Sequence, residues 1–218
     1  MSDKELNIKS STIEKGLDLA KDFLGKLIFP AVEEVGLLMG DNIKVWRFKN
    51  QIRLLNNVEK YVNEKNISTK KVPLKILLPL LENASLEEDP ILNKMWENLL
   101  INYIDSNKLF TISIFPMFLS QLSTREATFL KHLIILVKEY DLSGEKLKLY
   151  ENDFRGVQSL NIPDAEISNM VRLGIIGWIS GIDILTRCEF NRPSVSNKEK
   201  YIYLTKLGEE FIQACSIK

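Results

Sequence analysis

The strongest constraint on the fold of this chain is the helical spacing of its apolar residues over the first half of the sequence. Between residues 43 and 64, Phe48, Ile52, Leu55 and Val62 recur at intervals that place them on one side of a helix. Three further segments show the same spacing: 11–29, 73–84 and 90–104. The first of these opens with Ser and Thr residues typical of a helix start. We therefore expect an all-helical amino-terminal region over residues 1–110.

The second half of the chain mixes helices with short strands. Residues 123–140 are amphipathic, residues 163–174 predict a short helix that ends at Gly174, and residues 205–215 predict a last helix. Between the last two helices lie three β-rich stretches, "IIGWIS", "IDILTRCEF" and "KYIYL", and the latter two flank a polar turn, as in a β-hairpin. This order predicts a winged-helix-like α+β domain over residues 111–218. The expected fold class is mainly α, with a small β-hairpin.

Composition excludes several classes of protein. Lysine and arginine together number 29, and so do aspartate and glutamate. This balance also holds separately in residues 1–110 and 111–218, whereas a dedicated nucleic-acid-binding domain normally carries a basic excess. Two cysteines outside any CxxC pattern favour reduced thiols, and the polar start "MSDKELNIKSST" lacks a signal peptide. No apolar run approaches the roughly 20 residues of a spanning helix. We expect a cytoplasmic protein with no spanning segment.

A basic stripe on the helix over residues 43–64 is the leading candidate site. Its members are Trp46, Arg47, Lys49, Asn50, Arg53 and Lys60. Cations beside a tryptophan could hold phosphates and stack on a base. The stripe could equally lock onto an acidic counter-surface formed by Glu82, Glu87, Glu88 and Asp89, within a chain or between chains. A third interpretation is a solvated helix face.

The acidic segment itself could hold a divalent cation, but it lacks the alternating ligand spacing of a calcium loop. Carboxylates at the start of a helix favour its positive end, and this explains Glu87, Glu88 and Asp89 without a metal. We therefore predict no metal site. No phosphate-binding glycine loop or nucleophile elbow occurs in the sequence, and we expect no cofactor.

Two weaker patterns suggest other activities. Arg125 and the single histidine, His132, are separated by six residues, a spacing similar to the active motif of HEPN ribonucleases, in which His acts as acid or base and Arg stabilises charge. Such short motifs arise often by chance. Residues 16–40 are apolar enough to suggest a membrane-active effector, although Glu33 and Glu34 make the segment acidic where bilayer-bound helices are usually basic.

The winged-helix-like domain raises the question of DNA binding. Its expected recognition helix, residues 163–174, carries Asp164 and Glu166 and only one cation, Arg172, which suits a polyanion poorly. The expected wing, residues 187–200, is more basic and could contact nucleic acid through Arg187, Arg192, Lys198 and Lys200. We favour a protein-interaction role for this domain.

Three segments together resemble the abortive infection alpha family of bacterial phage-defence proteins. They are "VGLLMGDNIKVWRFKNQIRLL", "VPLKILLPLLENASLEEDPILNKMWENLL" and "YIYLTKLGEEFIQAC". The resemblance implies a mostly helical cytoplasmic protein that contributes to phage resistance by stopping growth of the infected cell. It implies no catalytic residues. We therefore expect a non-enzymatic protein that binds a macromolecular partner. Another protein, or self-association, is favoured over nucleic acid as that partner.

Overall fold

The computed structural model describes residues 11–27, 45–139, 149–150, 162–180 and 200–217. The chain divides into two compact units. Unit 1 comprises residues 1–120 with 217–218, and unit 2 comprises residues 121–216. The described residues are mainly helical, as the apolar spacing predicted, and unit 2 also contains a small antiparallel sheet.

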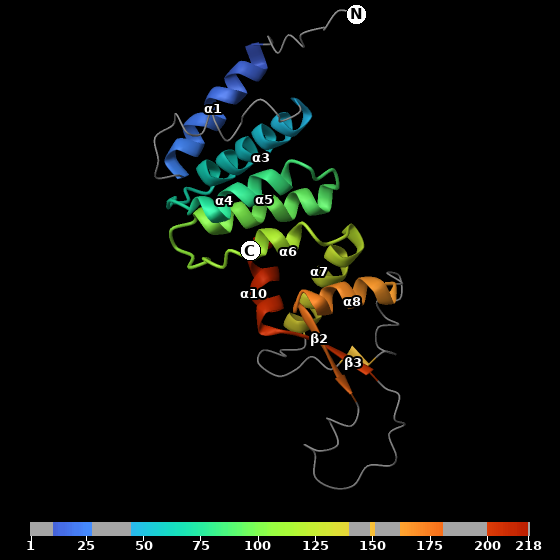
Figure 1. Ribbon diagram of the computed structural model, residues 1–218. Coiled ribbons are helices and arrows are strands. Elements are labelled where there is room, and N and C mark those ends of the chain that lie inside the picture. The colour runs from blue at the N-terminus through green and yellow to red at the C-terminus, as the bar shows by residue number, and fades with distance from the viewer. Residues whose placement is uncertain (1–10, 28–44, 140–148, 151–161, 181–199, 218) are drawn as a thin grey trace, which may run out of the picture. The chain divides into compact units, whose positions relative to one another are not determined.

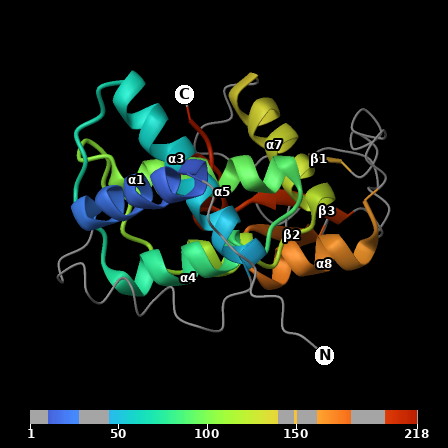
Figure 2. The same cartoon turned by 90° about the horizontal axis from the view of Figure 1, so that it is seen from above.

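Unit 1 is a stack of helices (Figure 1). Helix α3 packs against α1 on one side and against α4 and α5 on the other, and the short helix α6 packs against α4 and α5. Figure 2, which views the molecule from above, shows α1 crossing α3. The helices span Ser11–Leu27 (α1), Val45–Glu64 (α3), Leu74–Ala84 (α4), Pro90–Ile104 (α5) and Phe115–Leu119 (α6).

The apolar face predicted for α3 lies in the core of unit 1. Ile52, Leu55 and Val62 are buried, and Trp96 of α5 is 1% exposed. The described part of α1 also contributes its apolar face to the core, through Ala20, Phe23, Leu24 and Leu27. Burial of each large aliphatic side chain stabilises the unit by about 1.5–3 kcal/mol. Within the described residues, no helix has the length and apolar character to cross a membrane.

The turn between α4 and α5 is organised by the acidic segment. Asp89 stands at the amino end of α5, and its carboxylate accepts hydrogen bonds from the backbone N–H groups of Ile91 at 2.7 Å and Leu92 at 3.1 Å. Pro90 occupies the first helical turn, where its missing N–H costs no hydrogen bond. The helix-start interpretation of Asp89 is therefore confirmed.

The described residues of unit 2 form three helices and three strands. The helices are α7 (Thr124–Glu139), α8 (Asp164–Arg172) and α10 (Lys206–Ala214), and the strands are β1 (Leu149–Tyr150), β2 (Ile176–Ser180) and β3 (Lys200–Leu204). The strand order is β1-β3-β2 and both pairs are antiparallel. Gly174 follows α8 with a φ of 71°, the left-handed conformation expected there. The predicted strand "IDILTRCEF" lies outside the described residues.

Helix α7 begins with a reciprocal cap that also joins it to α8. Ser123 Oγ accepts from the Glu126 N–H at 3.1 Å, while the Glu126 carboxylate accepts from the Ser123 N–H at 2.6 Å. Glu126 is buried, and its second oxygen accepts from Asn169 Nδ2 at 2.8 Å. Asn169 belongs to α8, so one carboxylate fixes both the start of α7 and its contact with α8.

Candidate interaction surface on helices α3 to α5

The amino-terminal half of α3 contacts the turn between α4 and α5. Arg47 donates through Nε to Ser85 Oγ at 3.1 Å and through Nη2 to the Glu82 carbonyl at 3.3 Å. Asn50 donates to the Ser85 carbonyl at 3.1 Å. Ser85 is fully buried, and its hydroxyl donates to the Glu82 carbonyl at 2.6 Å. Two members of the basic stripe are therefore anchors for this turn.

The other cations of the stripe lie at the surface. Lys49 and Arg53 are exposed, and Arg53 Nη2 lies 3.5 Å from Asn93 Oδ1 on α5. Lys60 is further along α3 and pairs with Glu64 at 3.8 Å. The side chain of Trp46 lies outside the described side chains. The stripe thus divides into an anchoring part, Arg47 and Asn50, and an exposed part.

The four acidic residues have different environments. Glu82 and Glu88 are exposed. The Glu87 carboxylate accepts from the backbone N–H groups of Glu88 at 3.1 Å and Asp89 at 3.0 Å, and Asp89 caps α5. Among the side chains that the structure describes, no cation of α3 forms an ion pair with these carboxylates. The contacts from α3 go instead to backbone carbonyls and to Ser85.

Two exposed apolar residues lie within this charged region. Leu86 is 54% exposed and directly follows Ser85, which Arg47 and Asn50 hold. Ile91 is 40% exposed and lies in the first turn of α5, two residues before Asn93. Neither residue was predicted as a site residue, because helical spacing alone assigns aliphatic residues to the core. We call Lys49, Arg53, Glu82, Leu86, Glu88 and Ile91 the α3–α5 surface.

This surface combines aliphatic side chains with charges of both signs. Such a composition suits another protein, which can cover the apolar centre and place complementary charges at its rim. A polyanion would meet repulsion from Glu82 and Glu88. In the part of the chain that is described, no group of three His, Cys, Asp or Glu side chains is arranged to hold a metal ion.

The Arg125 and His132 pair lies on α7 of unit 2. Arg125 forms an ion pair with Glu166 of α8 at 3.9 Å, and His132 Nδ1 donates to the Thr128 carbonyl at 2.8 Å. Arg125 and His132 are seven positions apart on the helix, so their Cα atoms are roughly 10 Å apart along its axis. Both side chains are exposed and each has a local structural partner. The structure does not support a catalytic role for this pair.

The remaining candidates are only partly described. Arg187, Arg192 and Lys198 of the expected wing lie outside the described residues, and Lys200 begins β3. Of the apolar segment 16–40, residues 28–40 are not described. Cys215 is buried after α10, and burial raises the pKa of its thiol.

Comparison with models of protein families identifies the family of this chain. Residues 42–215 match the model for abortive infection alpha. The chain belongs to the abortive infection alpha family. A search of curated proteins and a search of solved structures found no match. Membership of this family suggests a role in abortive infection, a form of phage defence.

Two of the segments on which the resemblance rests meet in the structure. The first contributes Arg47 and Asn50, and the second contributes Ser85, so their contact is the hydrogen-bonded anchor of the α4–α5 turn. The third segment forms most of β3 and all of α10, and Thr205 caps this helix by accepting from the Gly208 N–H at 2.9 Å.

Proposed function

We propose that this member of the abortive infection alpha family acts in phage defence by binding a protein partner through the α3–α5 surface, without catalysing a reaction. The observation that carries the proposal is the exposure of Leu86 and Ile91 on a turn that Arg47 and Asn50 hold in place. A fixed apolar centre with charged neighbours loses little conformational entropy on binding.

We further propose that the protein has two domains and that the carboxy-terminal one is a winged-helix-like interaction module. The strand order β1-β3-β2, with α8 directly before β2, supports this assignment. Arg172 of α8 donates to Asn169 Oδ1 at 2.6 Å and to Gln121 Oε1 at 2.7 Å. The single cation of this helix is therefore engaged within unit 2, which favours a protein over DNA as its ligand.

The test is a phage-infection assay in cells that express the protein, with plaque counts and growth curves as readouts. We expect the variant Lys49→Glu/Arg53→Glu and the variant Leu86→Asp each to abolish protection, because both change exposed residues of the surface. Loss of an apolar anchor at an interface typically weakens binding by about 2 kcal/mol, roughly thirtyfold.

Leu19→Asp is the matched control, because Leu19 is 53% exposed, like Leu86, but lies on α1. This control and His132→Ala should both protect as the wild type does. Protection by Leu86→Asp and Lys49→Glu/Arg53→Glu at wild-type levels would refute the proposal. Loss of protection with His132→Ala alone would make RNA cleavage the activity to test.

A further inference from the structure

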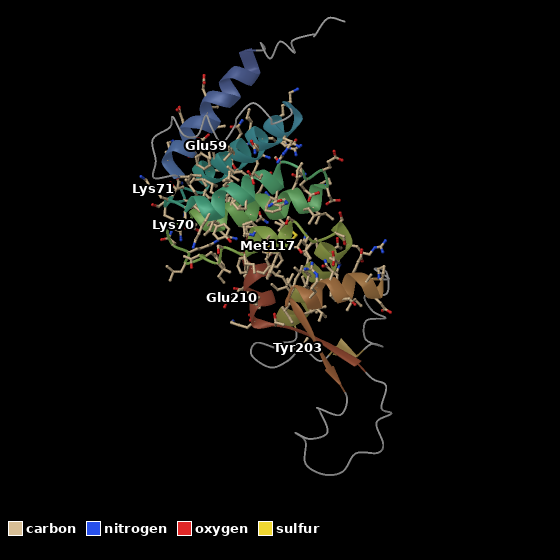
Figure 3. The ribbon with its side chains drawn as sticks, viewed as in Figure 1. Glu59, Lys70, Lys71, Met117, Tyr203 and Glu210 are labelled. Atoms are coloured by element: carbon tan, nitrogen blue, oxygen red, sulfur yellow. The ribbon has the colours of Figure 1, made fainter. Side chains whose placement is uncertain are left out.

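One end of unit 1 gathers lysines that the α3–α5 surface does not include. Helices α3 and α5 finish there, and the segment after α3 runs beside the segment after α5. The Lys70 N–H donates to the Ile104 carbonyl at 2.7 Å, and the Ser106 N–H donates to the Ser68 carbonyl at 2.9 Å. These contacts bring together five lysines, which we call the lysine cluster: Lys65, Lys70, Lys71, Lys75 and Lys108. Figure 3 labels two of them, Lys70 and Lys71.

Among the residues described at this end, few carboxylates lie beside the lysine cluster. Asp105 is buried and lies 3.8 Å from Lys108 Nζ. Glu59 and Glu64 pair instead with lysines outside the cluster, Lys26 at 4.0 Å and Lys60 at 3.8 Å. Lys65, Lys70, Lys75 and Lys108, taken with Asp105, give an excess of positive charge among the described residues of this end, in a chain whose overall charge is zero.

Two lysines of the cluster also fix the loop after α5. Lys70 Nζ donates to the Lys108 carbonyl, and Lys108 Nζ donates to Asn102 Oδ1. The Tyr103 hydroxyl donates to the Ile112 carbonyl at 2.5 Å. The loop is therefore tied to the helices both at Lys108 and at Ile112.

Leu109 projects from this fixed loop beside the lysine cluster. Its side chain is 92% exposed, a larger fraction than for any other large apolar side chain among the described residues. An aliphatic side chain in water is unfavourable by itself, and the hydrogen bonds on both sides of Leu109 hold it there. A leucine next to several lysines is complementary to a partner that carries negative charges at its surface and has an apolar layer a few ångströms beneath those charges.

We propose that the lysine cluster and Leu109 form a docking surface for an anionic lipid bilayer. Lysines near such a membrane are attracted by about 1 kcal/mol each, which corresponds to about fivefold in partition coefficient per charge. Leu109 would enter the boundary between head groups and acyl chains. This surface is separate from the α3–α5 surface, so the inference does not depend on the proposed function.

Nucleic acid suits this end less well. Residues 60–75 and 104–112 contain no arginine, and their aromatic side chains Tyr61 and Phe110 are half-buried. Single-stranded nucleic acid is normally bound by exposed aromatic side chains that stack on bases, together with cations. A protruding leucine has no role in contacts with a phosphate backbone.

The test is flotation of the purified full-length chain with lipid vesicles. The vesicles consist of phosphatidylcholine alone or of phosphatidylcholine with about one third phosphatidylserine. Binding is measured at low salt and at 0.15 M salt, where charges are screened beyond about 8 Å. We expect binding only to the vesicles that contain phosphatidylserine, and weaker binding at the higher salt. Lys65→Glu/Lys75→Glu should lower the partition coefficient at least about tenfold, and Leu109→Asp should do so as well.

Two matched controls keep the test specific. Lys131→Glu/Lys206→Glu makes the same change in net charge on exposed lysines of unit 2, and Ile135→Asp adds the same charge as Leu109→Asp at an exposed aliphatic residue of α7. Both should bind vesicles within about threefold of the wild type. All variants change exposed side chains, and thermal melts would verify folding.

Failure to bind vesicles containing phosphatidylserine at low salt would overturn the proposal. It would also be overturned if Lys131→Glu/Lys206→Glu lowered binding as much as Lys65→Glu/Lys75→Glu, because net charge would then account for the effect. A labelled single-stranded oligonucleotide is the third arm. Oligonucleotide binding that depends on Lys65 and Lys75 but not on Leu109, without vesicle binding, would assign the surface to nucleic acid instead.

Discussion

Substitution of Gly208 by alanine tests the packing of unit 2 most directly, because helix propensity and packing predict opposite signs. Gly208 lies in the first turn of α10. Alanine favours a helix interior over glycine by up to about 1 kcal/mol. A Cβ atom at this position, however, would lie 2.0 Å from the Ile175 carbonyl oxygen, and close carbon–oxygen contacts are normally about 3.3 Å or longer.

The Ile175 carbonyl cannot easily move away from such a Cβ atom. It accepts a hydrogen bond from the Thr205 N–H at 3.1 Å, and the Thr205 hydroxyl, whose hydrogen points toward the carbonyls of Gly174 at 2.5 Å and Ile175 at 3.0 Å, lies against it. The same hydroxyl caps α10 by accepting from the Gly208 N–H. Relief of the clash therefore separates α10 from the segment before β2 and weakens the cap. Overpacking typically costs about 1–3 kcal/mol and loss of a cap about 1 kcal/mol.

After the helix-propensity gain is subtracted, we expect Gly208→Ala to lower the free energy of unfolding of unit 2 by about 1–3 kcal/mol. The measurement is urea unfolding followed by circular dichroism, with hydrogen exchange to locate the effect. The rate of amide hydrogen exchange should rise in α10, β2 and β3 and stay unchanged in α5. Glu210→Ala, in the same helix, is the control and should change stability by less than about 0.5 kcal/mol. If Gly208→Ala is as stable as the wild type or more so, the close approach of α10 to Ile175 is wrong.

Three other substitutions test the polar contacts and the buried thiol. Arg47→Leu should destabilise unit 1 by about 2 kcal/mol in urea unfolding, because the turn at Ser85 loses both of its guanidinium hydrogen bonds; Lys49→Leu, which removes an exposed cation, should have little effect. Glu126→Ala should cost about 2–3 kcal/mol, since both the cap of α7 and the hydrogen bond from Asn169 are lost, and the double variant with Asn169→Ala should cost less than the sum of the two single changes. Burial keeps the Cys215 thiol protonated in the folded chain, whereas an unfolded thiol ionises above about pH 8.5. The free energy of unfolding should therefore fall as the pH rises above that value. Cys215→Val should make this fall smaller in urea titrations at about pH 7 to 10.

The sequence predicts the long helices because their periodicity is strong. Helix α3 was expected over residues 43–64 and is described as Val45–Glu64, with Ile52, Leu55 and Val62 buried as expected. Arg47 was expected to belong to the basic stripe of this helix. Its side chain is half-buried and contacts Ser85. Its partner could not be predicted, because the spacing of one helix does not specify which residue of another helix faces it.

Short elements carry too little pattern to be predicted. Helix α6 has five residues, and it exists because Phe115, Phe118 and Leu119 are buried in unit 1. Strand β1 has two residues and is defined by its pairing with β3. Nucleating so short a helix is unfavourable without tertiary contacts. Both elements are consequences of packing that the local sequence does not encode.

The candidate site shows the same division between what the sequence specifies and what packing decides. Its charged residues were predicted, because charges on the polar side of a helix follow from periodicity. Leu86 and Ile91 were not, since their exposure depends on how Arg47 and Asn50 hold the turn. An exposed leucine is recognisable only once the surrounding backbone is placed.

The two proposed surfaces should respond differently to salt. The α3–α5 surface carries charges of both signs, so salt screens attractive and repulsive terms together and the net effect on binding is small. The lysine cluster carries an excess of one sign, and its binding to an anionic surface should fall steeply between low salt and 0.15 M. The centres of the two surfaces are roughly 20 Å apart along α3, more than two Debye lengths at 0.15 M. Substitutions in one surface should therefore leave the other unaffected, and each can be tested in the same chain without disturbing its neighbour.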